Sequence, residues 1–168
     1  MNADQHRHNC HILIAGLLLL LAGCTNPFAS REERQLRQAE ERWESRNIAN
    51  YTFEMRTGCF CPPEINEWAI VEVRNGQIVS ARSLSGVLLS GIALTSRKTV
   101  DQLFDAARPP YEDWVGRVDF EFDSELGYPL KLQLDGKRNI ADAGVVYEAR
   151  NLRPNLSFSG TVSNSTLR

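Results

Sequence analysis

Two cysteines one residue apart, Cys59 and Cys61, are the residues best suited to chemistry in this sequence. They stand in the stretch T-G-C-F-C-P-P-E, residues 57–64. The pair fits a structural disulfide, two buried free thiols, or a thiol-redox site. The redox interpretation lacks the C-x-x-C spacing in which a helix amino terminus lowers a thiol pKa. A zinc site is disfavoured too, since two thiolates are half of a four-ligand shell.

A bridge between Cys59 and Cys61 sets a condition on the backbone. On an extended strand, Cα atoms two residues apart lie near the upper limit of about 7 Å for a disulfide. The chain must therefore curl, and Gly58 and the prolines at 62–63 permit this. Because the closed loop is very short, chain entropy adds little stability. We prefer the structural clasp, and the alternatives stay open.

Carboxylates near the end of the chain are a second set of candidate ligands. Asp123, Glu125, Asp135 and Asp142 lie close in sequence, and oxygen ligands suit a hard cation such as calcium. The segment D-S-E-L-G lacks the length of an EF-hand loop and its final bidentate glutamate. We therefore expect turn and strand-end roles for these residues and no metal site. A calcium-stabilised domain is an alternative.

The histidines limit the chemistry that the chain can perform. All three, His6, His8 and His11, lie within residues 1–23. If this segment is removed, no histidine remains for Ser-His or Cys-His catalysis or for metal binding. We predict no catalytic residues, no enzyme and no cofactor. The net charge of −2 lacks the basic face of a nucleic-acid binder, so no nucleic acid is expected as a partner.

Residues 1–23 have the features of an export signal. Arg7 precedes the apolar run I-L-I-A-G-L-L-L-L-L, which leads into L-A-G-C at Leu21–Cys24. A positive start, a short apolar segment and small residues at the cleavage point are typical of a signal peptide. The run is too short to span a bilayer, which takes about 20 apolar residues.

The sequence L-A-G-C closely resembles the bacterial lipoprotein box. The resemblance implies a diacylglycerol on the Cys24 thiol, cleavage before this residue, and an N-acyl chain on the new amino terminus. Three acyl chains exceed the two signals that stable anchoring requires, so a lipid bilayer is the expected partner. Thr25 in place of aspartate favours the periplasmic face of the outer membrane, provided that the host is Gram-negative. Residues 24–30 are then the lipidated cysteine and a short tether.

Downstream of the tether, the sequence predicts two amphipathic helices. Ser30 and Glu33 form a capping box at the start of a helix over residues 30–46. Thr99 and Gln102 form another at the start of a shorter helix, which the prolines at 109–110 end. Apolar residues follow one face of each helix, so both are expected to pack on a sheet.

Alternating apolar and polar residues predict strands at 51–57, 68–74, 77–83, 118–122, 128–134 and 145–152. Asn75 and Gly76 join two of them in a hairpin. The pattern of residues 85–96 fits both an edge strand and a loop. The expected fold class is α+β, an antiparallel sheet of about six strands with two helices on one face. We assign residues 31–153 to this single domain. Residues 154–168 are a polar tail, expected to be partly disordered.

The stretch F-D-S-E-L-G-Y-P at 122–129 is followed by Asp135 and by I-A-D at 140–142. This order resembles a family of bacterial lipoproteins and secreted proteins, domain of unknown function 6174 (DUF6174). The shared features also include Trp43 and Tyr51, the C-x-C segment, a V-x-N-G hairpin at 73–76 and T-V-D-x-L-F at 99–104. The similarity covers residues 30–152. The family has no assigned activity, so the resemblance implies only fold and location.

These observations lead to one preferred hypothesis for the function. It is a membrane-anchored lipoprotein of the cell envelope with a non-enzymatic binding or structural domain, and another envelope protein is its possible partner. One alternative is a thiol-redox accessory protein that uses Cys59 and Cys61. The other is the calcium-stabilised envelope domain.

Overall fold

The computed structural model describes residues 30–109, 115–137 and 144–155. The chain divides into two compact units, residues 1–34 and 35–168. The described part of the first unit is the start of helix α2 (Arg31–Glu44). Its predicted capping box is confirmed, since Glu33 N–H donates to Ser30 Oγ (3.1 Å) and Ser30 N–H donates to Glu33 Oε2 (3.0 Å).

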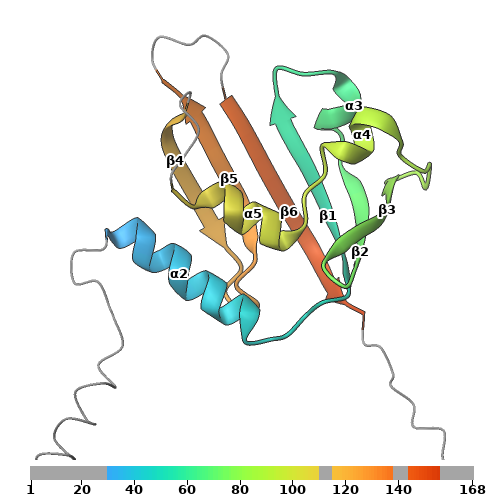
Figure 1. Cartoon of the computed structure of the whole chain (residues 1–168). Coiled ribbons are helices and arrows are strands. Elements are labelled where there is room, and N and C mark those ends of the chain that lie inside the picture. Colours follow the sequence, from blue (N-terminus) through green and yellow to red (C-terminus); the bar gives the residue numbers. More distant parts are fainter. Residues whose placement is uncertain (1–29, 110–114, 138–143, 156–168) are drawn as a thin grey trace, which may run out of the picture. The chain divides into compact units, whose positions relative to one another are not determined.

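Six strands of the second unit form one antiparallel sheet in the order β3-β2-β1-β6-β5-β4 (Figure 1). The strands are β1 (Tyr51–Cys59), β2 (Ala69–Arg74), β3 (Gln77–Ser83), β4 (Val115–Phe122), β5 (Pro129–Gly136) and β6 (Gly144–Pro154). The predicted α+β class is therefore confirmed. Asn75 and Gly76 have φ of 49° and 72°, as the predicted β2–β3 hairpin turn requires.

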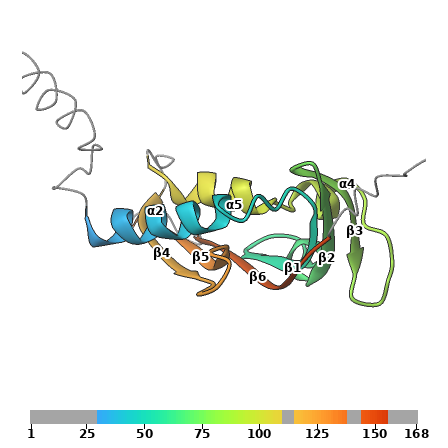
Figure 2. The same cartoon turned by 90° about the horizontal axis from the view of Figure 1, so that it is seen from below.

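Helix α2 and helix α5 (Val100–Ala107) lie on the same face of the sheet, as predicted (Figure 2). Two short helices were not predicted, α3 (Pro63–Asn66) and α4 (Gly91–Thr95). Helix α4 lies in residues 85–96, for which the sequence pattern fitted both an edge strand and a loop. In the described chain just before α4, strand pairing is limited to an isolated β-bridge between Arg82 of β3 and Leu88. Helices of four or five residues are too short to show a period of 3.6.

Alternation along β1 separates a buried face of the sheet from an open one. Tyr51, Phe53, Met55 and Thr57 point to the helices and are buried. The side chains packed in the same core come from both helices and from the neighbouring strands: Leu36, Ala39, Trp43, Val71, Val73, Leu103, Phe104, Leu132, Leu134 and Ala149. The intervening residues of β1 lie on the other face. Neither α2 nor α5 covers that face, which we call the open face (Figure 2).

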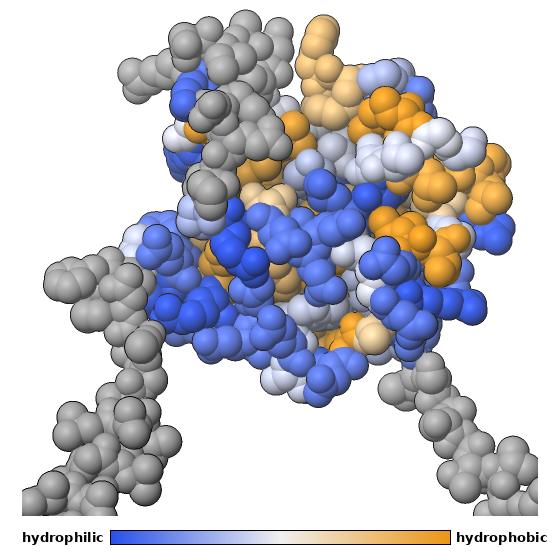
Figure 3. Space-filling model, viewed as in Figure 1, coloured by the Kyte–Doolittle hydropathy of each residue, from blue (hydrophilic) through white to orange (hydrophobic). Residues whose placement is uncertain are grey.

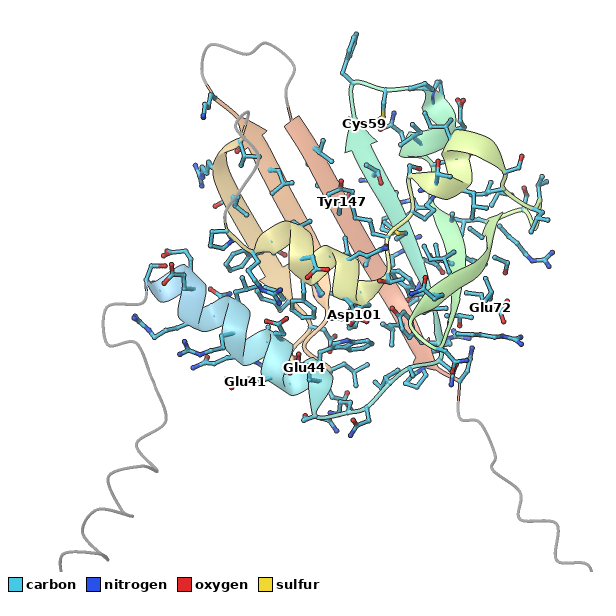
Figure 4. All side chains as sticks on the ribbon, in the orientation of Figure 1. Glu41, Glu44, Cys59, Glu72, Asp101 and Tyr147 are labelled. Atoms are coloured by element: carbon cyan, nitrogen blue, oxygen red, sulfur yellow. A yellow bond between two sulfur atoms is a disulfide. The ribbon has the colours of Figure 1, made fainter. Side chains whose placement is uncertain are left out.

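The amino terminus of α5 is fastened to both β1 and α2. Thr99 caps the helix through the predicted capping box. The backbone N–H of Val100 donates to the Tyr51 hydroxyl (2.9 Å), and Trp43 Nε1 donates to Asp101 Oδ1 (2.9 Å) (Figure 4). The Tyr51 hydroxyl and the Thr99 cap satisfy backbone donors that the first turn of a helix leaves unpaired, at Val100 and Gln102. The bonds to Tyr51 and Trp43 also fix α5 against the rest of the core.

The turn between β4 and β5 explains the motif F-D-S-E-L-G-Y-P. Asp123 Oδ1 accepts hydrogen bonds from the backbone N–H groups of Glu125 (3.0 Å) and Leu126 (2.6 Å). Gly127 has a φ of 87°, and a Cβ at this position would lie 2.3 Å from the carbonyl oxygen of Ala39 in α2. Glycine is therefore required both by the left-handed backbone and by the close approach of the helix.

Burial raises the pKa of the Tyr51 hydroxyl above its ordinary value of 10.0. The neutral phenol thus contributes stability that is complete below about pH 10 and is lost at higher pH, because the unfolded chain releases this proton first. We expect the free energy of unfolding to fall with pH above about 10, and to fall less steeply in the Tyr51→Phe variant. At neutral pH this variant should lose about 1–2 kcal/mol, since Val100 N–H loses its acceptor.

Urea unfolding across this pH range measures both effects. Burial also raises the pKa of Tyr128. The free energy of unfolding of the Tyr51→Phe variant should therefore still fall with pH, but with a smaller slope. Identical slopes for the two proteins would contradict this account of Tyr51.

Candidate functional site

Charged side chains pair across the central strands on the open face. Arg56 Nε donates to Glu148 Oε2 (2.5 Å), and Arg150 Nε donates to Glu54 Oε2 (2.8 Å). The indole ring of Trp68 lies beside both arginines, with its centroid 4.0 Å from Cζ of Arg150 and 5.1 Å from Cζ of Arg56. Ion pairs together with cation–π contacts hold the two guanidinium groups in fixed positions.

A pocket of about 330 Å³ opens on this face, near the end of β1. Its lining residues come from three adjacent strands and from α3: Arg56, Gly58, Asn66, Lys131, Gln133, Val146 and Glu148. Ligand pockets in proteins range from about 300 to 1,000 Å³, so this one suits a small ligand.

The hollow of this pocket lies at Gly58, near the end of β1, which is one of the two central strands of the sheet. A Cβ at this position would meet only Val146, at 3.7 Å from both its Cβ and its carbonyl oxygen, which is ordinary van der Waals contact. The backbone of Gly58 is thus compatible with a side chain. Glycine inside a strand lowers stability and often marks a site that a ligand approaches closely.

Lys131 is the unpaired charge of the pocket. It is half-buried, and among the described residues it has no hydrogen bond and no ion pair. Its register neighbours are Glu148 on β6 and Glu121 on β4. Glu148 is bonded to Arg56, and Glu121 is exposed and outside the pocket lining. The lining groups Arg56, Lys131 and Glu148 therefore sum to one positive charge.

Cys59 lies at the end of β1 (Figure 4) and directly follows Gly58 of the pocket lining. The structure joins it to Cys61 in a disulfide, with the Cα atoms 5.2 Å apart. The chain thus curls after β1, as the expected clasp requires. Phe60 between them is 89% exposed. For a loop this short, chain entropy provides about 1.6 kcal/mol.

Asn66 connects this disulfide loop to the pocket. Its Oδ1 accepts a hydrogen bond from Cys59 N–H (2.9 Å), and its Nδ2 donates to the carbonyl oxygen of Cys61 (3.2 Å). The same side chain lines the pocket. The position of α3, which ends at Asn66, therefore sets both the loop and one wall of the pocket.

A buried arginine holds α3 in place. Arg97, which is 3% exposed, donates to the carbonyl oxygens of Glu64 (3.0 Å), Ile65 (3.3 Å) and Glu67 (3.1 Å) at the end of α3. It also donates to the carbonyl oxygen of Ala93 in α4 (2.9 Å). Burial lowers the pKa of this guanidinium, which stays charged because an arginine in a protein does not deprotonate. Backbone carbonyls thus stabilise the charge, and the charge satisfies the end of the helix.

The structure does not bring the calcium candidates together. Asp123 lies in the β4–β5 turn, where its carboxylate accepts backbone N–H groups, one of them from Glu125. Asp135 lies at the other end of β5, opposite Arg117. Asp142 lies outside the described residues. Within the described ranges, no three His, Cys, Asp or Glu residues are close enough to hold a metal ion.

Exposed apolar side chains gather beside β3 and α4 (Figure 3). Four belong to the segment after β3 and are 53% to 64% exposed: Leu84, Val87, Leu88 and Ile92. Within this segment, Leu89 N–H donates to the carbonyl oxygen of Ala81 (2.8 Å). The segment thus pairs with one end of the edge strand β3, which limits the backbone left open to another chain.

Lys131, Asn66 and Arg97 were not predicted from the sequence as site residues. Alternation places Lys131 and Arg56 on the polar sides of their strands. Their meeting in one pocket depends on the pairing of β1 with β6 and of β6 with β5. The one available signal was Gly58, a glycine that interrupts an otherwise regular strand.

The expected lipidation site Cys24 and the expected signal at 1–23 lie outside the described residues. Of the expected tail at 154–168, the structure describes only residues 154 and 155, and β6 includes the first of them. In the ranges that the structure describes, no helix has the length and hydrophobicity needed to cross a membrane. A family of unknown function, DUF6174, matches residues 35–154. Comparison with curated proteins and with solved structures finds no significant match.

Proposed function

Because the chain belongs to DUF6174, a family of unknown function, we propose its role from its own residues. The protein is a lipid-anchored bacterial lipoprotein of the cell envelope, and its α+β domain is a non-enzymatic binding domain. The pocket on the open face is the binding site.

The anchor is supported by the sequence around Cys24. An apolar run, small residues and a cysteine follow one another in L-L-A-G-C. This combination is the signal for acylation and cleavage in the lipoproteins that it resembles. Acyl chains on Cys24 would hold the domain at a membrane surface, since one chain gives only marginal binding and several give a stable anchor.

The binding role is carried by one observation, the half-buried Lys131 without a partner in an open pocket. A charge that is partly withdrawn from water is normally paired. The other polar side chains of the pocket each have at least one partner: Arg56 with Glu148, Asn66 with the disulfide loop, and Gln133 with Asp135. This arrangement is typical of a preformed site that lacks its ligand.

The Cys24→Ser variant tests the anchor. We expect the wild-type chain from bacterial membranes to begin at Cys24 and to carry three acyl groups, whereas the variant should carry none, because its thiol is missing. Mass spectrometry of the intact proteins measures this difference. Cys10→Ser, inside the signal, is the matched control and should behave as wild type. An intact Met1 or an unmodified Cys24 on the wild-type protein would contradict the anchor.

The Gly58→Leu variant tests the binding site. Its Cβ fits without a clash, so the variant should fold and place a bulky side chain in the hollow. In a thermal-shift screen of small polar metabolites against the full chain in detergent, we expect at least one compound to stabilise wild type and not Gly58→Leu. At a ligand concentration of 100 times Kd, the gain is about 2.7 kcal/mol. If no compound distinguishes the two proteins, the pocket is not the binding site.

A further inference from the structure

We propose that the pocket on the open face binds a ligand through a single carboxylate group, with Lys131 as its counter-ion. This inference deepens the proposed function and rests on it. The ligand is a free amino acid or short peptide, or the carboxyl terminus of a polypeptide, since these share the same chemistry.

The sign of the ligand's charge follows from the pocket lining. Lys131 carries the one charge of the lining that forms no hydrogen bond or ion pair with a described residue. Arg56 lies in the same lining, and its Nε is occupied by Glu148. A guanidinium has five N–H donors, so its remaining groups are available to an anion. An anionic group that enters the pocket thus gains an ammonium partner in a half-buried setting, where ion pairs are stronger than in water.

The same lining limits the anion to one charge. Glu148 belongs to the pocket, and its carboxylate would repel a second negative charge on the ligand. A dianion such as phosphate would leave that repulsion uncompensated, because the three charged lining groups sum to only one positive charge. A carboxylate matches this balance.

Two oxygen acceptors indicate what lies beside the carboxylate. Gln133 donates from Nε2 to Asp135 Oδ1 (2.8 Å), which fixes its amide and leaves Oε1 as an acceptor. Glu148 is bonded to Arg56 through Oε2, and its Oε1 has no described partner. Both acceptors suit an N–H or ammonium group. Amino acids and peptide ends carry such a group close to a carboxylate.

The size of the pocket agrees with this ligand class. Its volume of about 330 Å³ lies at the small end of the range of about 300 to 1,000 Å³ for ligand pockets. One or two amino-acid residues fit that space. The walls are also held before a ligand arrives, because Asn66 is bonded to the disulfide loop and Arg56 is held by Trp68 and Glu148.

Calorimetric titration of the full chain in detergent micelles tests the inference. The probes are alanyl-alanine, its carboxyl-terminal amide, and a soluble hexapeptide that ends in Ala-Ala. We expect alanyl-alanine to bind and its amide to bind at least about tenfold more weakly, which is 1.4 kcal/mol. Lys131→Met should weaken alanyl-alanine by a similar factor, while Lys131→Arg should retain binding. Lys137→Met removes the same charge from an exposed position outside the pocket lining and should match wild type.

Either hexapeptide result supports the proposal and identifies the source of the carboxylate. Binding as tight as that of the dipeptide indicates a polypeptide terminus, and exclusion indicates a free small molecule. The proposal is overturned if no probe binds, if the amide binds as well as the acid, or if a folded Lys131→Met protein binds normally. If a neutral compound binds wild type and not Gly58→Leu, the proposal of a carboxylate ligand is overturned, while the proposed function stays intact.

Discussion

The buried guanidinium of Arg97 is the constraint on which the site depends. A charge withdrawn from water costs several kcal/mol unless other groups solvate it. Here four backbone carbonyls do so, three from the end of α3 and one from α4. The same bonds supply donors to carbonyls that the last turn of α3 leaves unpaired. Because α3 ends with Asn66, which holds the Cys59–Cys61 loop and lines the pocket, the cation inside the fold sets one wall of the site at the surface.

The helices pack on one side of the sheet and leave the polar side without their cover (Figure 2). The helices bury the aromatic and aliphatic row of β1 that begins with Tyr51. The opposite row is polar and pairs its charges with β6, as in the Arg56–Glu148 ion pair. Exposed cross-strand pairs of this kind add only a little stability each. Their value to the protein is geometric, since they fix polar groups around the hollow at Gly58. The unpaired Lys131 lies in that hollow, and the proposed preference for an anion rests on it.

Local chemistry made much of the fold predictable. The capping box at Thr99, the turn at Asn75-Gly76 and the alternation from Tyr51 to Thr57 each depend on neighbouring residues, and all three appear in the structure. The site was not predictable in the same way. Arg97 meets carbonyls about thirty residues away, and Lys131 reaches the pocket only through the strand order. Short helices such as α3 show no period, so the sequence did not reveal the element that carries Asn66.

Amide hydrogen exchange at Cys59 in an Arg97→Met protein tests this dependence most directly. The Cys59 N–H is bonded to the side chain of Asn66, so its protection reports whether α3 stays in place. The account predicts that this amide exchanges at least about tenfold faster, relative to the β1–β2 ladder, when Arg97 is replaced. Arg108→Met, which removes a surface arginine bonded to Glu40, should leave it unchanged. Undiminished protection of Cys59 in a folded Arg97→Met protein would contradict the central role of the buried arginine.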